Sequence, residues 1–431
     1  MRRLLFPATV CLRKSLRAIR AVAVLLLLND VVLHAQEPTA RDTAYLDSVF
    51  RAHRYSLALE NGRLTGAGAR FLLDASRDAQ FFVIGESHYV AQIPRFAEAL
   101  FSSLHSDRGY NYYPVEFGPV ITGMLSAAGV RGDRARSFAL ARKYPHAFQF
   151  WDDEEIDAFA DIARTSTARS QPLWGLDNEW GALHALDRLT AIAPTAEARA
   201  LARQLDERAR AIESTRPYAI VDVPRFISDA DSSSFEALRA AFHPAAGSEA
   251  ESLLDAIEIS NRIYLLDRGA RRNEITGYRS NADRERYMKA LFMTQYRNAR
   301  RSGDTLPRVL VKIGSTHGGN WRSPTYVESL GNFLYEFALT NERSSFHLVV
   351  WLVNEPGTYW TLADDPPYLP LARVGSTSEW AVVDFRPLRD LWYAGKLRAL
   401  SKELRDAVFG YDAVLLLGSG TRGTYEQLRD H

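Results

Sequence analysis

Short apolar runs alternate with longer amphipathic stretches along most of the chain. The apolar runs have the length of buried strands, and they lie at Gln80–Gly85, Tyr110–Glu116, Pro172–Asp177, Arg308–Gly314, Phe346–Leu352, Trp380–Asp384 and Tyr411–Leu417. Strands that are apolar on both faces and separated by helices are typical of parallel sheets covered on two sides. The pattern therefore predicts an α/β fold with a mainly parallel sheet flanked by helices.

A long helical stretch interrupts the series of strands. From about residue 183 to residue 302, Ala, Leu, Arg and Glu recur with helical periodicity and no strand-like run appears. This stretch is too long for a single crossover between neighbouring strands, and no Gly/Ser- or Pro-rich linker marks either edge. We therefore expect one domain over residues 36–431, with a helical insertion at about residues 183–302.

The first 35 residues have the composition of a secretory signal. Basic residues precede an apolar core at Ala21–Leu28, and the small Ala35 comes before a polar segment. The apolar core is too short for a comfortable transmembrane span, so cleavage near Ala35 is predicted, and an uncleaved anchor is the alternative. We expect a periplasmic or secreted protein, without stable membrane insertion after cleavage.

Composition narrows the chemistry and the partners. The only cysteine, Cys11, lies inside the signal segment, so the mature chain has no thiol for a disulfide, a thiolate metal site or a nucleophile. The 53 basic and 52 acidic residues nearly balance and form no long run of one sign, which argues against a nucleic-acid partner. A small-molecule substrate is therefore the expected partner.

Ionisable residues follow several of the predicted strands at the point where each strand ends. Glu86 and His88 come directly after one strand, and Glu116 ends the next apolar run. Asp177 and His317 stand at or just beyond two further strand ends. Parallel strands bring their carboxyl ends to one edge of the sheet, where the ligands of open α/β folds bind. We therefore expect these side chains to converge.

Two chemistries suit this group of side chains. A histidine oriented by a carboxylate can act as a general base at neutral pH, so His88 could activate water while Glu86 or Glu116 fixes its orientation. Imidazole and carboxylate are also ligands of zinc, manganese and iron. The alternative is therefore a metal site, although no pair has the helical histidine spacing of a strong zinc motif. Its ligands would be Glu86, His88, Glu116 and His317.

Further side chains near the predicted strand ends are candidates for substrate binding. Arg95 and Arg286 are candidate anion holders, for which a surface role is the competing interpretation. Tyr89 and Trp151 are candidates for lining an apolar pocket, although core packing explains such aromatic residues equally well. Asp177 completes this set because of its place at a strand end.

The order of these motifs resembles the erythromycin esterase-like superfamily, which also includes TIKI-type and haem-uptake ChaN-like proteins. The resemblance runs across about residues 80–418 and rests on Gly85–His88, Glu116, Arg284–Met288 and Gly314–His317. It implies an exported hydrolase without a metal or other cofactor, in which His88 activates water to attack an ester or lactone. Glu86, Glu116 and His317 would surround that water, and His317 would hold the oxyanion or protonate the leaving group.

The spacing within the first motif implies two alternatives. Only Ser87 separates Glu86 from His88, whereas the esterases usually have two residues at this place. The shorter spacing is more similar to the TIKI-type and ChaN-like branches. These branches imply either a metal-dependent hydrolase or peptidase, or a non-enzymatic protein that binds haem or another ligand.

Overall fold

The computed structural model describes most of the chain after the N-terminal segment. The described residues are 38–127, 129–148, 152–213, 225–270, 274–354 and 361–429. The predicted signal, residues 1–35, and Trp151 lie outside them. Within these ranges, we find no helix with the length and apolar character needed to cross a membrane.

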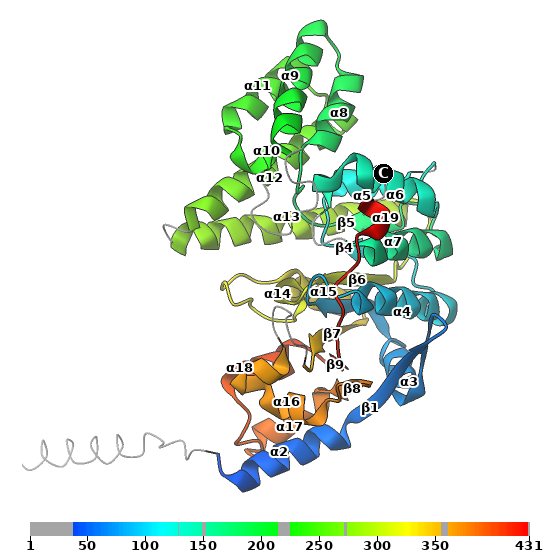
Figure 1. Cartoon of the computed structure of the whole chain (residues 1–431), viewed down its shortest axis with the longest axis vertical. Helices are drawn as coiled ribbons and strands as arrows, with labels where there is room; N and C mark the ends of the chain where they lie inside the picture. The colour runs from blue at the N-terminus through cyan, green and yellow to red at the C-terminus, as the bar shows by residue number, and fades with distance from the viewer. Residues whose placement is uncertain are drawn as a thin grey trace, which may run out of the picture.

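A single mixed sheet forms the centre of the molecule (Figure 1). In the described residues it has nine strands in the order β2-β1-β8-β9-β7-β3-β6-β4-β5. Neighbouring strands from β9 to β5 are parallel, whereas β8, β1 and β2 continue the sheet in antiparallel fashion. The predicted fold class, α/β with a mainly parallel sheet, is confirmed. The bounds are β1 Arg54–Glu60, β2 Arg63–Thr65, β3 Ala79–Glu86, β4 Tyr113–Val115, β5 Leu173–Gly175, β6 Val309–Gly314, β7 Ser344–Leu352, β8 Trp380–Asp384 and β9 Ala413–Leu417.

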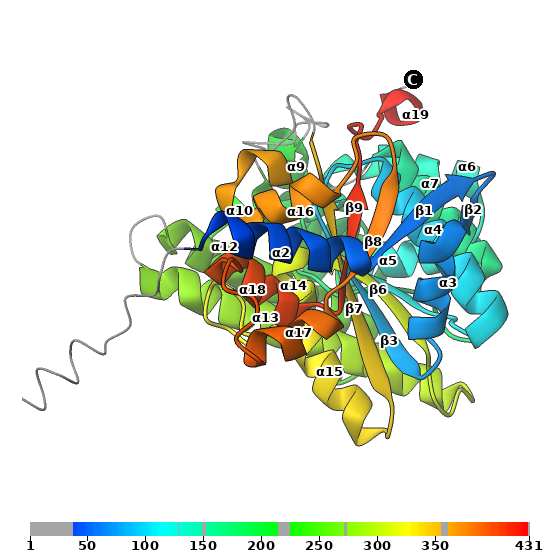
Figure 2. The ribbon, with the colours of Figure 1, turned by 90° about the horizontal axis from the view of Figure 1, so that it is seen from below.

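Helices cover both faces of this sheet, and Figure 2 shows α2, α16, α17 and α18 grouped on the side opposite α3 to α7. Outside the stretch between β5 and β6, the helices are α2 Ala40–Ala52, α3 Gly66–Ala75, α4 Gln92–Arg108, α5 Pro119–Ser126, α6 Arg134–Lys143, α7 Asp153–Thr165, α14 Ser315–Gly318, α15 Leu330–Thr340, α16 Leu369–Val374, α17 Arg386–Tyr393, α18 Lys402–Gly410 and α19 Glu426–Arg429. Short 3-10 helices lie at Pro145–Ala147, Leu362–Asp364 and Pro366–Tyr368.

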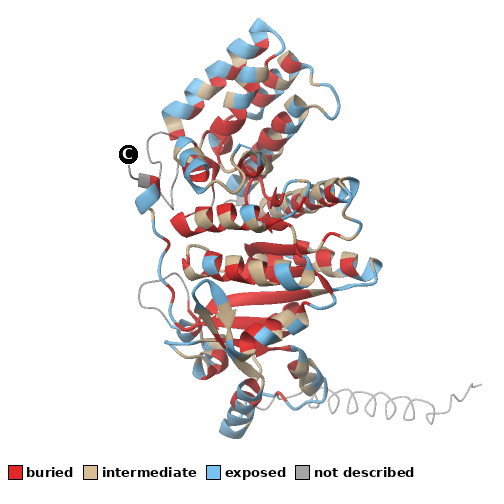
Figure 3. Ribbon diagram, turned by 90° about the vertical axis from the view of Figure 1, so that its right-hand side faces the viewer, coloured by how far each residue is buried: buried red, intermediate tan, exposed pale blue. Residues whose placement is uncertain are grey.

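Both faces of the central strands are buried, as the red strands of Figure 3 show. In β3, Phe82 and Ile84 belong to the core under α4. Phe81 and Val83 belong to a second core with α15 and with α13, Glu274–Arg301. Successive side chains of a strand point to opposite faces. An uninterrupted apolar run is therefore what a strand in this position requires.

The chain between β5 and β6 is helical in its described part. Figure 1 shows α8 to α12 as a layer beyond the β5 edge of the sheet, with α13 running back toward it. These helices fill the stretch in which the sequence predicts an insertion. Their bounds are α8 Leu183–Ile192, α9 Ala196–Glu213, α10 Phe226–Asp229, α11 Ser232–Phe242, α12 Glu249–Ala270 and α13 Glu274–Arg301.

Substitution of Phe81 tests how much the packing of helices on the sheet contributes to the free energy of unfolding. Its buried ring lies 5.5 Å from that of Phe292 and 5.8 Å from that of Phe337, measured between ring centroids. Phe81→Ala leaves a cavity between the sheet and two helices, so we expect the free energy of unfolding to fall by about 3–5 kcal/mol in urea denaturation. Leu339→Ala, at a residue of α15 that is 50% exposed, should change it by less than about 0.5 kcal/mol. Equal losses would contradict this assignment of the core.

Candidate functional site

Four adjacent strands deliver the polar residues to one edge of the sheet. β3 ends at Glu86, and Glu116 and Asp177 follow closely after β4 and β5. His317 lies in α14, directly after β6. These strands are parallel and adjacent in the order β3-β6-β4-β5, so their carboxyl ends lie side by side. The structure thus brings together the side chains that were expected to converge.

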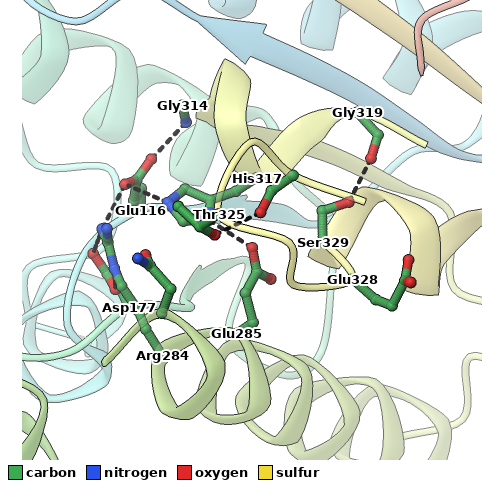
Figure 4. A network of polar contacts seen from close by, with 12 residues as sticks. Glu116, Asp177, Arg284, Glu285, Gly314, His317, Gly319, Thr325, Glu328 and Ser329 are labelled. Carbon is green, nitrogen blue, oxygen red and sulfur yellow. Dashed lines mark hydrogen bonds and ion pairs between the residues drawn. The ribbon is translucent and has the colours of Figure 1, made fainter. Parts of the chain in front are cut away.

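Glu116 lies at the centre of the group (Figure 4). Its carboxylate accepts hydrogen bonds from the Arg284 guanidinium, at 2.6 Å, and from the backbone N–H of Gly314. Nε2 of His88 lies 3.9 Å from Oε2 of this carboxylate, and Nε2 of His317 lies 3.7 Å from Oε1. Burial raises the pKa of Glu116, but His317, Arg284, His88 and the Gly314 N–H outweigh it and lower the pKa to about 2. Glu116 is therefore an anion at neutral pH.

His88 is held through its second ring nitrogen. Nδ1 of His88 lies 3.2 Å from Oε1 of Glu86, and Oε2 of Glu86 accepts a hydrogen bond from Nζ of Lys312 at 2.7 Å. Burial opposes ionisation of Glu86, but the positive charge of Lys312 and the contact with His88 lower its pKa. An ionised Glu86 can accept a hydrogen bond from Nδ1 of His88, while Nε2 of the same ring faces Glu116. The side chain of His88 is 23% exposed, so solvent reaches it.

His317 is held in the same way by a different carboxylate. Its Nδ1 lies 2.7 Å from Oε1 of Glu285, a residue of α13 (Figure 4). Burial and the positive charge of Arg284 lower the pKa of His317, but the hydrogen bond to Glu285 and the charges of Glu116 and Glu285 outweigh them. The net shift is upward, so His317 keeps its proton at a higher pH than an ordinary histidine does.

Arg284 joins two strand ends from the helix that crosses them. Its guanidinium donates to both carboxylate oxygens of Asp177, which is fully buried, and to Glu116. A planar guanidinium suits this arrangement because it offers several donors in a fixed geometry. Asp177, predicted to bind substrate, pairs with Arg284 in the structure.

The backbone at Gly314 determines how closely the central side chains approach. A Cβ atom at this position would lie 3.0 Å from both Oε2 of Glu116 and Nε2 of His88. Contacts this short are rare for a real Cβ, so a larger residue would push one of the two side chains aside. Glycine at the end of β6 thus lets the carboxylate and the imidazole meet above the strand.

The phase of α13 decides which arginine of the Arg284–Met288 segment reaches the strand ends. Arg286 is 74% exposed and pairs with Asp283 at 2.7 Å. Residues two apart on an α-helix lie roughly 200° apart around its axis, so Arg284 and Arg286 cannot face the same neighbours. Arg286 therefore points away from the site, and Arg284 is the arginine that the structure places there.

Arg95 and Tyr89 lie beside the site, in contacts with the end of the chain. Arg95 pairs with Glu154 at 3.0 Å, and the same carboxylate accepts the backbone N–H of Thr424 at 2.9 Å. Tyr89 has a positive φ of 67°, and its carbonyl accepts the N–H of Gly423 at 3.3 Å. The C-terminal segment therefore packs against the loop that carries His88. No motif in the sequence predicts this contact.

Sequence reasoning also missed Lys312 and Glu285. Lys312 is a lone charge inside an apolar strand, and a charge that must be buried requires a partner, so its position was a usable signal. Glu285 stands next to Arg284, in the Arg284–Met288 segment on which the family resemblance rests. Its role depends on how α13 docks, which no local pattern reveals.

The side chains do not fit the metal alternative. Within the described ranges, no three His, Cys, Asp or Glu side chains are arranged to hold a metal ion. Lys312 holds Glu86, and Arg284 holds both Glu116 and Asp177. A divalent cation would have to displace these fixed cations from the oxygens that it needs. The carboxylates are thus committed to the protein's own positive charges.

Comparisons with solved structures show what the fold is similar to. One is an erythromycin esterase mutant in its open conformation, with 11% sequence identity and a TM-score of 0.55, covering 86% of this chain and 98% of that one. Another is a succinoglycan biosynthesis protein, with 13% sequence identity and a TM-score of 0.57. The match covers 89% of this chain and 99% of that one. A third structure, of a Bacillus cereus protein, has 14% sequence identity and a TM-score of 0.51. The match covers 90% of this chain and 99% of that one. No protein-family model and no curated protein matches the chain. The resemblance predicted from the motifs is confirmed at the level of the fold.

Arg284→Ala tests the balance of charge at the strand ends. It leaves the buried carboxylates of Asp177 and Glu116 without their common cation, so we expect the free energy of unfolding to fall by about 3–5 kcal/mol. Chemical denaturation at pH 7 measures this. Arg286→Ala, two residues away on the exposed side of the same helix, is the matched control and should cost less than about 0.5 kcal/mol. Similar losses in the two variants would show that the ion pairs of Arg284 do not support the fold.

Proposed function

We propose that this chain, which has the fold of an erythromycin esterase, is a hydrolase that attacks an ester or lactone with water activated by His88. The arrangement of two histidines around Glu116 carries the proposal. Each imidazole is fixed at Nδ1 by its own carboxylate, and each Nε2 lies 3.7–3.9 Å from Glu116. These distances are longer than those of direct hydrogen bonds, so both Nε2 atoms face one carboxylate without being hydrogen-bonded to it.

His88 acts as the general base in this reaction. Its Nε2 takes a proton from water while the water oxygen forms a bond to the carbonyl carbon. The imidazolium that results is stabilised by Glu86 at Nδ1 and by the negative charge of Glu116 near Nε2. The ionised carboxylates on both sides thus favour the charge that develops on His88 during the attack.

His317 supplies the acid. The pKa of His317 is raised, which favours the doubly protonated ring, and Nε2 donates a proton to the leaving oxygen as the carbon–oxygen bond breaks. One water is consumed, and an acid and an alcohol are formed. The proton gained by His88 replaces the one that His317 gives up, so the pair returns to its starting state through solvent.

We also propose that the reaction needs no metal and that the protein acts outside the cytoplasm. Hydrolysis proceeds without metal, because Lys312 and Arg284 already compensate the carboxylates. The basic and apolar composition of the first 35 residues supports export to the periplasm or the medium. A small molecule bearing an ester or lactone is the proposed substrate class.

Substitution of His88 tests the general base. With p-nitrophenyl butyrate and a macrolide lactone as probes, we expect His88→Ala to lower kcat/KM by about 10²- to 10⁴-fold, while thermal denaturation shows an intact fold. His243→Asn is the control. His243 is exposed and has a φ of 41°, a conformation that asparagine tolerates, so this variant should hydrolyse the probes at the wild-type rate. Activity should survive EDTA. Full hydrolysis by folded His88→Ala would refute the role of His88.

Substitution of Glu285 tests the acid through the pH profile. Glu285→Gln removes a negative charge that raises the pKa of His317, so the acid form is lost at a lower pH than in the wild type. We therefore expect the alkaline limb of kcat/KM to move to lower pH, while the acidic limb stays in place. Rates measured from pH 5 to pH 10 reveal the shift. An unchanged alkaline limb would exclude His317 as the acid.

A further inference from the structure

A lysine occupies the interior of the central sheet, where charged residues are rare. Lys312 is 2% exposed and lies on β6, with Ile84 of β3 and Val115 of β4 as its neighbours in register. An ammonium group in such a place costs several kcal/mol unless it is paired and hydrogen-bonded. Packing alone would favour an aliphatic residue here, so the charge has another purpose.

Lys312 joins two carboxylates that come from different parts of the fold. Nζ lies 2.7 Å from Oε2 of Glu86 and 3.1 Å from Oε2 of Glu155. Glu155 is 2% exposed and stands in the first turn of α7, where its N–H bonds to the capping carboxylate of Asp152 at 2.8 Å. A continuous chain of contacts therefore runs from α7 through Lys312 and Glu86 to Nδ1 of His88.

We propose that Lys312, anchored by Glu155, is a positioning residue that holds Glu86 ionised and thereby keeps the proton of neutral His88 on Nδ1. The catalytic part of this inference rests on the proposed function, whereas the effect on the tautomer of His88 does not. Burial opposes the ionisation of Glu86, and the positive charge of Lys312 is the largest influence that offsets it. Without Lys312, burial would favour the protonated form of Glu86, whether or not Glu155 is charged. A protonated Glu86 would donate to Nδ1, and the proton of His88 would then move to Nε2.

The pKa shifts of Glu155 and Glu86 are in opposite directions, as this arrangement requires. Burial raises the pKa of Glu155 to about 7, although Lys312 opposes the shift, and Glu86 raises it further. For Glu86, by contrast, the net shift is downward. Of the two carboxylates that share Lys312, the one that contacts His88 is thus the one held in the ionised form.

Lys312→Met, with nitrogen NMR of full-length protein labelled at histidine, tests the inference directly. The His88 signal is assigned by its loss in His88→Gln. We expect neutral His88 to carry its proton on Nδ1 in the wild type and to shift toward the Nε2 form in Lys312→Met. With p-nitrophenyl butyrate, kcat should fall about tenfold or more, with little change in KM. Lys402→Met removes an exposed lysine of α18 that pairs with Asp406, and it should leave both readouts unchanged.

The double variant Lys312→Met/Glu155→Gln separates positioning from stability. It removes one positive and one negative charge together, so it should recover stability relative to Lys312→Met, and it carries the test if the single variant does not fold. A positioning role predicts that the Nε2 tautomer and the low kcat persist in the double variant. Recovery of both readouts, or a His88 tautomer that never changes, would overturn the inference. A wild type that shows the Nδ1 tautomer but hydrolyses no ester would instead refute only the proposed function.

Discussion

Carboxylates held below the surface are the constraint on which the rest of this structure depends. Each would cost several kcal/mol of folding free energy if it were ionised and left without a partner. Glu116 and Asp177 share Arg284, while Glu86 and Glu155 share Lys312. One cation comes from α13, and the other from the middle of β6. The docking of α13 on the strand ends is therefore an electrostatic requirement as well as a hydrophobic one.

This distribution of charge gives His88 and His317 different surroundings, and so different roles in proton transfer. His317 lies buried between Glu285 and Glu116, and its pKa is raised. His88 is partly exposed, and its Nδ1 bonds to a carboxylate that Lys312 already neutralises. An acid and a base on either side of one anion are what hydrolysis by activated water requires. The same compensation commits the carboxylate oxygens, so these ligand-type residues do not fit a metal site.

The sequence predicted the sheet and the convergence of its ends because both follow from local rules. Uninterrupted apolar runs indicate strands that are buried on both faces, and parallel strands align their carboxyl ends. The edge hairpin of β1 and β2 was not predicted, because its residues are mostly half-buried and form no apolar run. Arg284 and Glu285 required the docking of a helix more than a hundred residues from the first motif. Arg284 and Arg286 lie in the same helical segment, and only tertiary contacts show that Arg284 is the one that reaches the strand ends.

Neutron diffraction from crystals of the full-length protein near neutral pH tests the central claim most directly, because it locates the protons themselves. The account predicts deuterium on both ring nitrogens of His317, on Nδ1 alone of His88, and on neither oxygen of Glu116. Deuterium on Nε2 of His88, or on a carboxylate oxygen of Glu116, would contradict it. Either result would remove the base, or the anion that sets the two histidines apart.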